Sequence, residues 1–169
     1  MVKYLKKYLV AFLFLTSFLL GSTVAYASIS FIVHNGEVDQ GWQGVGRFYT
    51  TSGSGHGYDG TSYWNYSSSG SSSNYGYGLW ECPVANDTLA TYVFVPDYYT
   101  TASSVKYTIL HEGRATTINI SSYNNRVNEF VYMGSFQDTS SSSLIVQMDS
   151  RYQLSDGEYI DWDEVKFTA

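Results

Sequence analysis

Aromatic and small polar residues crowd into one glycine- and serine-rich stretch between predicted strands. The candidate ligand-binding residues there are Tyr58, Asp59, Tyr63, Trp64, Asn65 and Tyr66. Sugar rings stack their apolar C–H faces on aromatic rings, and their hydroxyls bond to carboxylate and amide groups. The stretch therefore predicts a carbohydrate-binding site, with packing of the same rings in the core as the alternative. Strand alternation would turn Trp64 inward and Tyr63 outward.

Carboxylates gather near the two ends of the folded part of the chain. They are Glu37, Asp39, Asp161, Asp163 and Glu164. If the two ends pair, these oxygens could converge on calcium, although no cofactor is otherwise expected. The alternatives are solvated edge charges that discourage sheet-to-sheet aggregation, and a glycosidase acid pair.

Nothing in the sequence forms a recognisable catalytic motif. His34, His56 and His111 fall in different strands or loops, and no Gly-x-Ser-x-Gly or His-Glu-x-x-His sequence is present. We therefore expect no enzyme activity and assign no catalytic residues. The single cysteine, Cys82, excludes a disulfide within the chain, and we expect a buried thiol. An intermolecular disulfide or a catalytic role is the alternative.

Short alternating or apolar segments must position these groups, because helical periodicity is nearly absent after residue 27. The expected strands are Ser30–His34, Gly44–Thr50, Ser62–Tyr66, Tyr75–Cys82, Thr88–Val95, Val105–Leu110, Ala115–Ile120, Glu129–Phe136, Leu144–Met148 and Tyr159–Phe167. Gly113 marks a hairpin turn between two of them. The pattern predicts an all-β fold, a single jelly-roll-like antiparallel β-sandwich over residues 28–169.

The last expected strand, Tyr159–Phe167, is expected to close the sheet. We expect it to pair with the segment around Ile29–Val33 and so close the sandwich. Its large apolar residues fall in two phases of alternation, Ile160 and Trp162 in one and Val165 and Phe167 in the other. One extra residue near Asp163 and Glu164, a β-bulge, would bring all four onto the same face.

Residues 1–27 have the order of a secretory signal peptide. A basic start with Lys3, Lys6 and Lys7 precedes an apolar run and an Ala25-x-Ala27 cleavage pattern. The apolar run is shorter than the roughly 20 residues that a membrane span needs. We expect a secreted, extracellular protein with no membrane attachment after cleavage.

The charge of the mature chain excludes some partners. Without the three lysines of the leader, six basic residues face 15 acidic ones, a net charge of −9. Such a surface repels nucleic acid and anionic lipid, and no basic cluster offsets it. Neither is expected as a partner.

A series of short motifs follows one another over about residues 31–167. They are Ile32-Val-His-Asn-Gly36, Gly41-Trp42, Gly46-Arg-Phe48, Gly57-Tyr-Asp-Gly-Thr-Ser-Tyr63, Leu79-Trp-Glu-Cys-Pro83, Leu89-Ala-Thr-Tyr-Val-Phe-Val-Pro96, Val105-Lys-Tyr-Thr-Ile-Leu-His-Glu-Gly113, Phe130-Val-Tyr-Met-Gly-Ser-Phe136 and Tyr159 to Phe167. Their order resembles that of the golvesin / xanthan lyase C-terminal carbohydrate-binding-domain-like family. Phe48 and Ala90 depart from the family, which usually has tryptophan and glycine there. The resemblance implies a jelly-roll-like sandwich and a non-catalytic extracellular module. It implies no defined ligand residues.

Together these observations predict a secreted, non-catalytic protein that binds extracellular or cell-wall polysaccharide through exposed aromatic rings. The alternative is a structural or adhesive extracellular protein that binds protein partners or copies of itself. Exposed tyrosines and a long serine-rich loop suit both functions equally well.

Overall fold

The structure is a computed structural model that describes residues 28–37, 41–52, 56–70, 73–139 and 141–169. The predicted signal peptide and Asp39 lie outside the described residues. No helix within the described ranges is long and apolar enough to cross a membrane.

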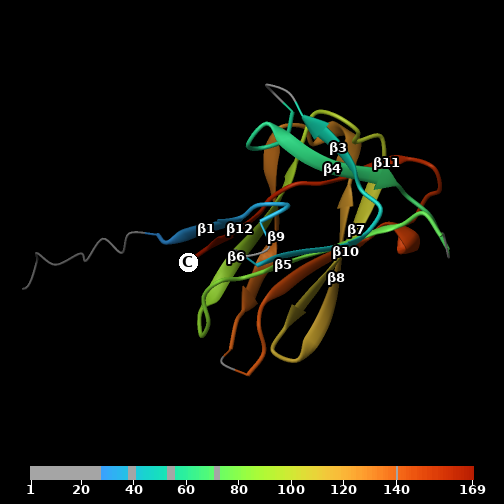
Figure 1. The fold of residues 1–169 in the computed structure, drawn as a ribbon. Helices are drawn as coiled ribbons and strands as arrows, with labels where there is room; N and C mark the ends of the chain where they lie inside the picture. Colours follow the sequence, from blue (N-terminus) through green and yellow to red (C-terminus); the bar gives the residue numbers. More distant parts are fainter. Residues whose placement is uncertain (1–27, 38–40, 53–55, 71–72, 140) are drawn as a thin grey trace, which may run out of the picture.

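The described part of the chain forms three antiparallel sheets (Figure 1). The first contains β1 (Ser30–Val33), β12 (Val165–Thr168), β6 (Thr88–Val95) and β9 (Glu129–Gln137), in that order. The second contains β2 (Trp42–Gly46), β5 (Gly76–Glu81), β10 (Ile145–Asp149), β7 (Ser104–His111) and β8 (Arg114–Ser121). The third contains β11 (Tyr159–Trp162), β4 (Thr61–Tyr66) and β3 (Tyr49–Ser52). The predicted all-β, antiparallel sandwich is confirmed.

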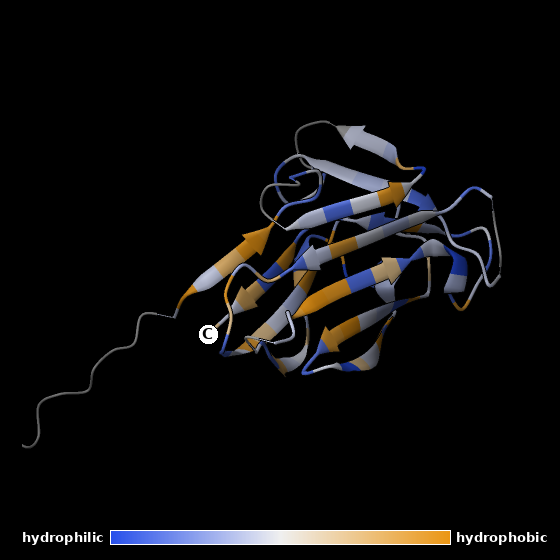
Figure 2. Cartoon of the chain, turned by 60° about the horizontal axis from the view of Figure 1, so that its bottom comes forward, coloured by the Kyte–Doolittle hydropathy of each residue, from blue (hydrophilic) through white to orange (hydrophobic). Residues whose placement is uncertain are grey.

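Alternating side chains of the two larger sheets fill the core, and Figure 2 shows the apolar positions recurring along the strands. In β7, Val105, Tyr107 and Ile109 are fully buried while the residues between them are not. Two-residue periodicity sends these three to one face of the sheet. The hairpin that follows turns at Glu112 and Gly113, both with positive φ (47° and 70°), as the glycine signal predicted.

The two ends of the described chain lie side by side, as predicted. Strand β1 pairs with β12 in antiparallel register, with Phe31 opposite Phe167. The backbone N–H of Ala169 also donates to the carbonyl of Ile29 at 2.9 Å. The outer strand β1 thus covers an edge that β12 would otherwise expose.

The predicted bulge near Asp163 and Glu164 is wrong, because the expected last strand is two strands in different sheets. Strand β11 belongs to the three-stranded sheet and β12 to the four-stranded sheet. The chain changes sheets at the turn of Asp163 and Glu164, which we call the acidic turn. All four large apolar residues of this segment are fully buried, but they lie on two sheets rather than on one face of a bulged strand. They are Ile160, Trp162, Val165 and Phe167.

The expected strand Gly44–Thr50 divides in the same way, into β2 and β3. Gly46 has a φ of 103°, and a Cβ there would lie 2.2 Å from the carbonyl oxygen of Tyr75. Only glycine adopts this backbone at so close an approach, so the ladder ends there and the chain passes to the third sheet.

Four aromatic residues outside the candidate site pack in or against the core. Trp42, Trp80 and Trp162 are buried, and Phe48 packs partly buried against them. Cys82 is buried too, and this burial is the main reason why its pKa is raised to about 11. The predicted buried thiol is thus confirmed.

Candidate functional site

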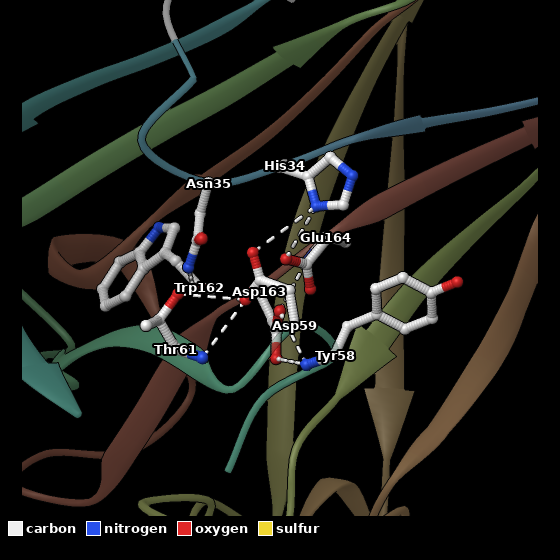
Figure 3. Close-up of polar contacts among 8 residues, drawn as sticks. All are labelled: His34, Asn35, Tyr58, Asp59, Thr61, Trp162, Asp163 and Glu164. Carbon is white, nitrogen blue, oxygen red and sulfur yellow. Dashed lines mark hydrogen bonds and ion pairs between the residues drawn. The ribbon is translucent and has the colours of Figure 1, made fainter. Parts of the chain in front are cut away.

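The structure divides the six candidate ligand-binding residues among three places. Four of them lie on β4, where Tyr63 and Asn65 point to one face of the strand and Trp64 and Tyr66 to the other. Tyr58 and Asp59 lie in the loop before β4, beside the acidic turn (Figure 3). They therefore do not form one site.

Tyr63 and Asn65 face the interior, so the prediction that Tyr63 turns outward is wrong. The Tyr63 ring stacks against Trp42 at 6.2 Å and lies 5.5 Å from Phe48. The Asn65 amide is fully buried and donates to the carbonyl of Arg47 at 2.7 Å. Core rings of β2 and its neighbours cover this face of the third sheet, and alternation then places Trp64 on the opposite face.

Five rings form a cluster on that opposite face, which we call the tyrosine stack. Its members are Tyr49, Trp64, Tyr66, Tyr99 and Tyr159. Trp64 lies nearly parallel to Tyr49 at 4.5 Å (22°) and to Tyr99 at 4.1 Å (15°). Tyr49 comes from β3 on one side of β4, and Tyr99 packs on Tyr159 of β11 on the other side. Both faces of the indole are thus covered, and neither is open to a sugar.

Hydrogen bonds between phenols hold the exposed edge of the stack. The hydrogen bond of the Tyr66 hydroxyl to Tyr159 is the main cause of the raised pKa of Tyr66, and the hydrogen bond of the Tyr99 hydroxyl to Tyr98 likewise raises the pKa of Tyr99. Tyr66 remains 39% exposed and Tyr98 44%. The stack therefore offers ring edges and hydroxyls rather than open faces.

The acidic turn and Asp161, on the preceding strand β11, bring three carboxylates into the interior. Asp161, Asp163 and Glu164 are at most 1% exposed, so these three are not the solvated edge charges weighed from the sequence. Burial raises the pKa of Asp163 to about 8 and that of Asp161 well above its usual range. Asp161 accepts from the Ser62 hydroxyl at 2.9 Å, and Asp163 from the Tyr58 backbone N–H at 3.1 Å.

His34 and Asp59 meet the acidic turn at the surface (Figure 3). The His34 Nδ1 lies 3.3 Å from Glu164 Oε1 and 3.7 Å from Asp59 Oδ2. Among the described residues, these three form the group of histidine and acidic side chains that could hold a metal ion. Of the five carboxylates considered for calcium, only Glu164 belongs to it, and Glu37 is exposed. The ring of Tyr58 packs on Phe94 and Phe130 instead.

A hollow of about 280 Å³ lies on the face of the five-stranded sheet that points away from the core. We call it the sheet groove. It is lined by Tyr77, Lys106, Thr108, Gln147, Asp149 and Tyr152. The first five come from the adjacent strands β5, β10 and β7, and Tyr152 comes from the short 3-10 helix η3 (Ser150–Tyr152).

Strand register places these side chains on one face. Tyr77 lies opposite Asp149, and Gln147 lies opposite Thr108, so each pair projects to the same side. Between them, Tyr107 and Met148 point into the core. The groove is thus the polar side of strands whose apolar side builds the sandwich.

Gln153 fixes η3, and with it Tyr152, against β7. Its side chain accepts from the Lys106 N–H at 2.8 Å and donates to the Asp149 carbonyl at 2.7 Å. Tyr152 itself stays 54% exposed, and the Arg151 guanidinium pairs with Asp149 at 2.6 Å. The backbone that carries the Tyr152 ring is thus held against the sheet, which lowers the cost of ordering this segment in a complex.

Sequence reasoning missed the groove because its residues are scattered singly along the chain. Tyr77, Gln147 and Tyr152 lie in separate segments of the chain, without the local crowding found near Trp64. The available signal was alternation, which marks Lys106 and Thr108 as the polar positions of β7. That signal identifies an outward face but not the three strands that share it.

Comparisons with known proteins show a shared fold. No family model and no curated protein matches the chain. A xanthan lyase from Paenibacillus has a similar structure, with a TM-score of 0.61 and 17% identity over 82% of this chain. A weaker similarity is to an exo-β-1,3-galactanase from Phanerochaete chrysosporium, with a TM-score of 0.48 and 17% identity over 83% of this chain and 29% of that one. Another is to a Clostridium thermocellum xylanase, with a TM-score of 0.43 and 15% identity over 80% of this chain and 28% of that one.

The chain spans only 13% of the length of that lyase. The likeness therefore concerns a part of a larger protein, and at this identity it establishes architecture alone. The architecture is that of a β-sandwich similar to one found in a carbohydrate-active protein.

Proposed function

We propose that this protein is a secreted, non-catalytic module that binds an extracellular or cell-wall polysaccharide in the sheet groove. The observation that carries the proposal is the juxtaposition of Tyr77 and the exposed Tyr152 with hydrogen-bonding side chains in one open hollow. Stacking on a ring and bonding to hydroxyls are the two interactions that a sugar offers.

The polar groups of the groove cover both roles in hydrogen bonding. Lys106 donates, Asp149 accepts, and Thr108 and Gln147 do both. The Lys106 ammonium lies 5.9 Å from the centre of the Tyr152 ring, so the ring is bordered by a donor. A neutral sugar has donors and acceptors at every hydroxyl, and a mixed lining of this kind suits it.

The composition of the groove supports binding rather than hydrolysis. Glycosidases need two carboxylates about 5 to 9.5 Å apart across the scissile bond. Asp149 is the one carboxylate among the residues that line the groove, and it is engaged by Arg151. Polysaccharide as the ligand class is further supported by the fold shared with a protein whose name gives xanthan as its substrate.

Retention on insoluble polysaccharides and cell walls tests the proposal. We expect the purified protein to be retained on one polymer, and Tyr152→Ala to weaken binding at least about tenfold, as expected for an exposed aromatic anchor. The melting temperature should not change, because the ring is more than half exposed. Tyr132→Ala is the matched control, since Tyr132 is 55% exposed on β9 in the other large sheet.

Equal loss in both variants, or none in either, would contradict the groove as the binding site. Retention on no polymer, together with concentration-dependent self-association, would favour the adhesive alternative.

A further inference from the structure

We propose that His34, Asp59 and Glu164 bind a divalent transition-metal ion of the zinc class, and not calcium. The three residues come from segments far apart in the sequence: the residue after β1, the loop before β4 and the acidic turn (Figure 3). One ligand atom from each lies within 4.8 Å of the others. The proposal is independent of the polysaccharide-binding function.

The separations between the ligand atoms suit a small ion. Two ligands of tetrahedral zinc, each about 2.0 to 2.1 Å from the metal, lie about 3.3 Å apart. The His34 Nδ1 is 3.3 Å from Glu164 Oε1 and 3.7 Å from Asp59 Oδ2. An ion between these atoms needs only small side-chain movements.

An unsatisfied buried atom points independently to a ligand. The side chain of Glu164 is fully buried, and its Oε2 has no hydrogen-bond partner among the described residues. His34 is the one basic group within ion-pair distance of this carboxylate in the described structure. Burying a carboxylate with one oxygen unsatisfied is costly, and a cation bound by both oxygens of Glu164 would remove that cost.

Surrounding hydrogen bonds hold the ligands in position. Asp59 Oδ1 accepts hydrogen bonds from the Thr61 N–H at 3.1 Å and from the Thr61 hydroxyl at 3.0 Å. The other oxygen, Oδ2, therefore faces His34. Next to His34, the Asn35 amide donates to the Trp162 carbonyl at 2.7 Å. Metal ligands in proteins are oriented by such outer hydrogen bonds.

The imidazole decides which ion fits. Calcium takes oxygen ligands only, whereas a neutral imidazole with two carboxylates suits zinc and its neighbours in the transition series. The His34 and Asp59 side chains are 27% and 41% exposed, so an ion can enter from solvent and keep a water ligand. Such an ion would join the first and last strands of the fold.

Metal binding by the purified protein after chelator treatment and dialysis tests the proposal. We expect calorimetry to show that one Zn²⁺ binds per chain, and the melting temperature to rise with Zn²⁺ concentration. Co²⁺ in place of Zn²⁺ should give a visible absorption band. Calcium at the same concentrations should neither bind in calorimetry nor raise the melting temperature. His34→Gln and Asp59→Asn should each weaken Zn²⁺ binding at least about tenfold.

His56→Gln is the matched control, because His56 forms a similar pair with Asp97 at 3.3 Å and should bind Zn²⁺ like the wild type. Both test substitutions are at partly exposed positions, so the fold should survive them. An absence of Zn²⁺ binding would show that His34 and Glu164 form an ion pair only, and would overturn the proposal. Unchanged binding in both variants, or tighter binding of calcium than of zinc, would overturn it as well.

Discussion

The tyrosine stack and the sheet groove are both aromatic surfaces, but they use their rings differently. In the stack, Trp64 lies between two parallel rings, and the faces that a sugar would need are occupied. In the groove, Tyr152 is 54% exposed, with a lysine and hydrogen-bonding groups around it. The richer cluster is therefore the poorer candidate for binding.

This difference teaches that accessible ring faces, and not the number of rings, indicate a carbohydrate site. The stack stabilises the three-stranded sheet, on which few apolar side chains of other types are available. Aromatic pairs add about 0.5–1.5 kcal/mol each beyond the area they bury. Breaking the stack should therefore affect stability, and changing the groove should affect binding.

The largest expected effect is that of Trp64→Ala on stability. Removing the central ring deletes two parallel contacts and leaves a cavity, so the free energy of unfolding should fall by about 2–3 kcal/mol. Urea unfolding measures this, and polysaccharide retention of the folded variant should match the wild type. Loss of retention at unchanged stability would instead identify the stack as the binding site.

Gln147→Ala should have a smaller effect, and on affinity alone. A lost hydrogen bond to a sugar hydroxyl costs about 1 kcal/mol, which is roughly a fivefold weaker binding. Affinity electrophoresis in gels containing the retained polysaccharide measures it. Gln43→Ala is the control, since Gln43 is exposed on β2 of the same sheet but does not line the groove. Equal weakening in the two variants would count against a defined groove.

Asp161→Asn should change how stability depends on pH. Asp161 of β11 lies opposite Trp64 of β4. Its pKa is raised above the unfolded value of about 3.9, mainly by burial and further by the charge of Asp163. Above pH 4 the folded state then binds more protons than the unfolded state, so stability falls as pH rises. The neutral asparagine removes this contribution. In chelator, the variant should gain stability over the wild type between pH 4 and pH 8, and parallel melting curves would contradict this.

Cys82 reports whether damage to the stack reaches the five-stranded sheet. Its pKa of about 11 and its burial should make the folded thiol react about 100-fold more slowly with a thiol reagent at pH 8 than the unfolded chain does. The rate should stay the same in Trp64→Ala if the two regions are independent. Faster labelling in that variant, under folding conditions, would show that they are coupled.

Much of the fold could be predicted because strands bury alternate residues. The pattern of β7 and the turn at Gly113 are local properties, and the structure has them where they were expected. The two divided strands could not be predicted, since a change of sheet depends on what lies nearby in space. At Gly46 the cause is the carbonyl of Tyr75, about 29 residues further along the chain.

The candidate sites were less predictable for the same reason. Crowding in sequence suggested one site around Tyr63 and Trp64, but alternation sends neighbouring side chains to opposite faces. The partners of Trp64 come from β3 and from the loop after β6, and those of Glu164 from the other end of the chain. The sequence placed Asp59 beside sugar-binding rings, and nothing in it indicated that Asp59 lies next to His34.

The pairing of β1 with β12 has a mechanical consequence. Ile29 and Ala169 are neighbours at one end of this ladder, and antiparallel hydrogen bonds run across the strands. A force that pulls these two residues apart therefore acts along the bonds and loads them one at a time. The fold should open like a zipper from this edge at low force, whereas a force applied along β12 would load the ladder as a whole.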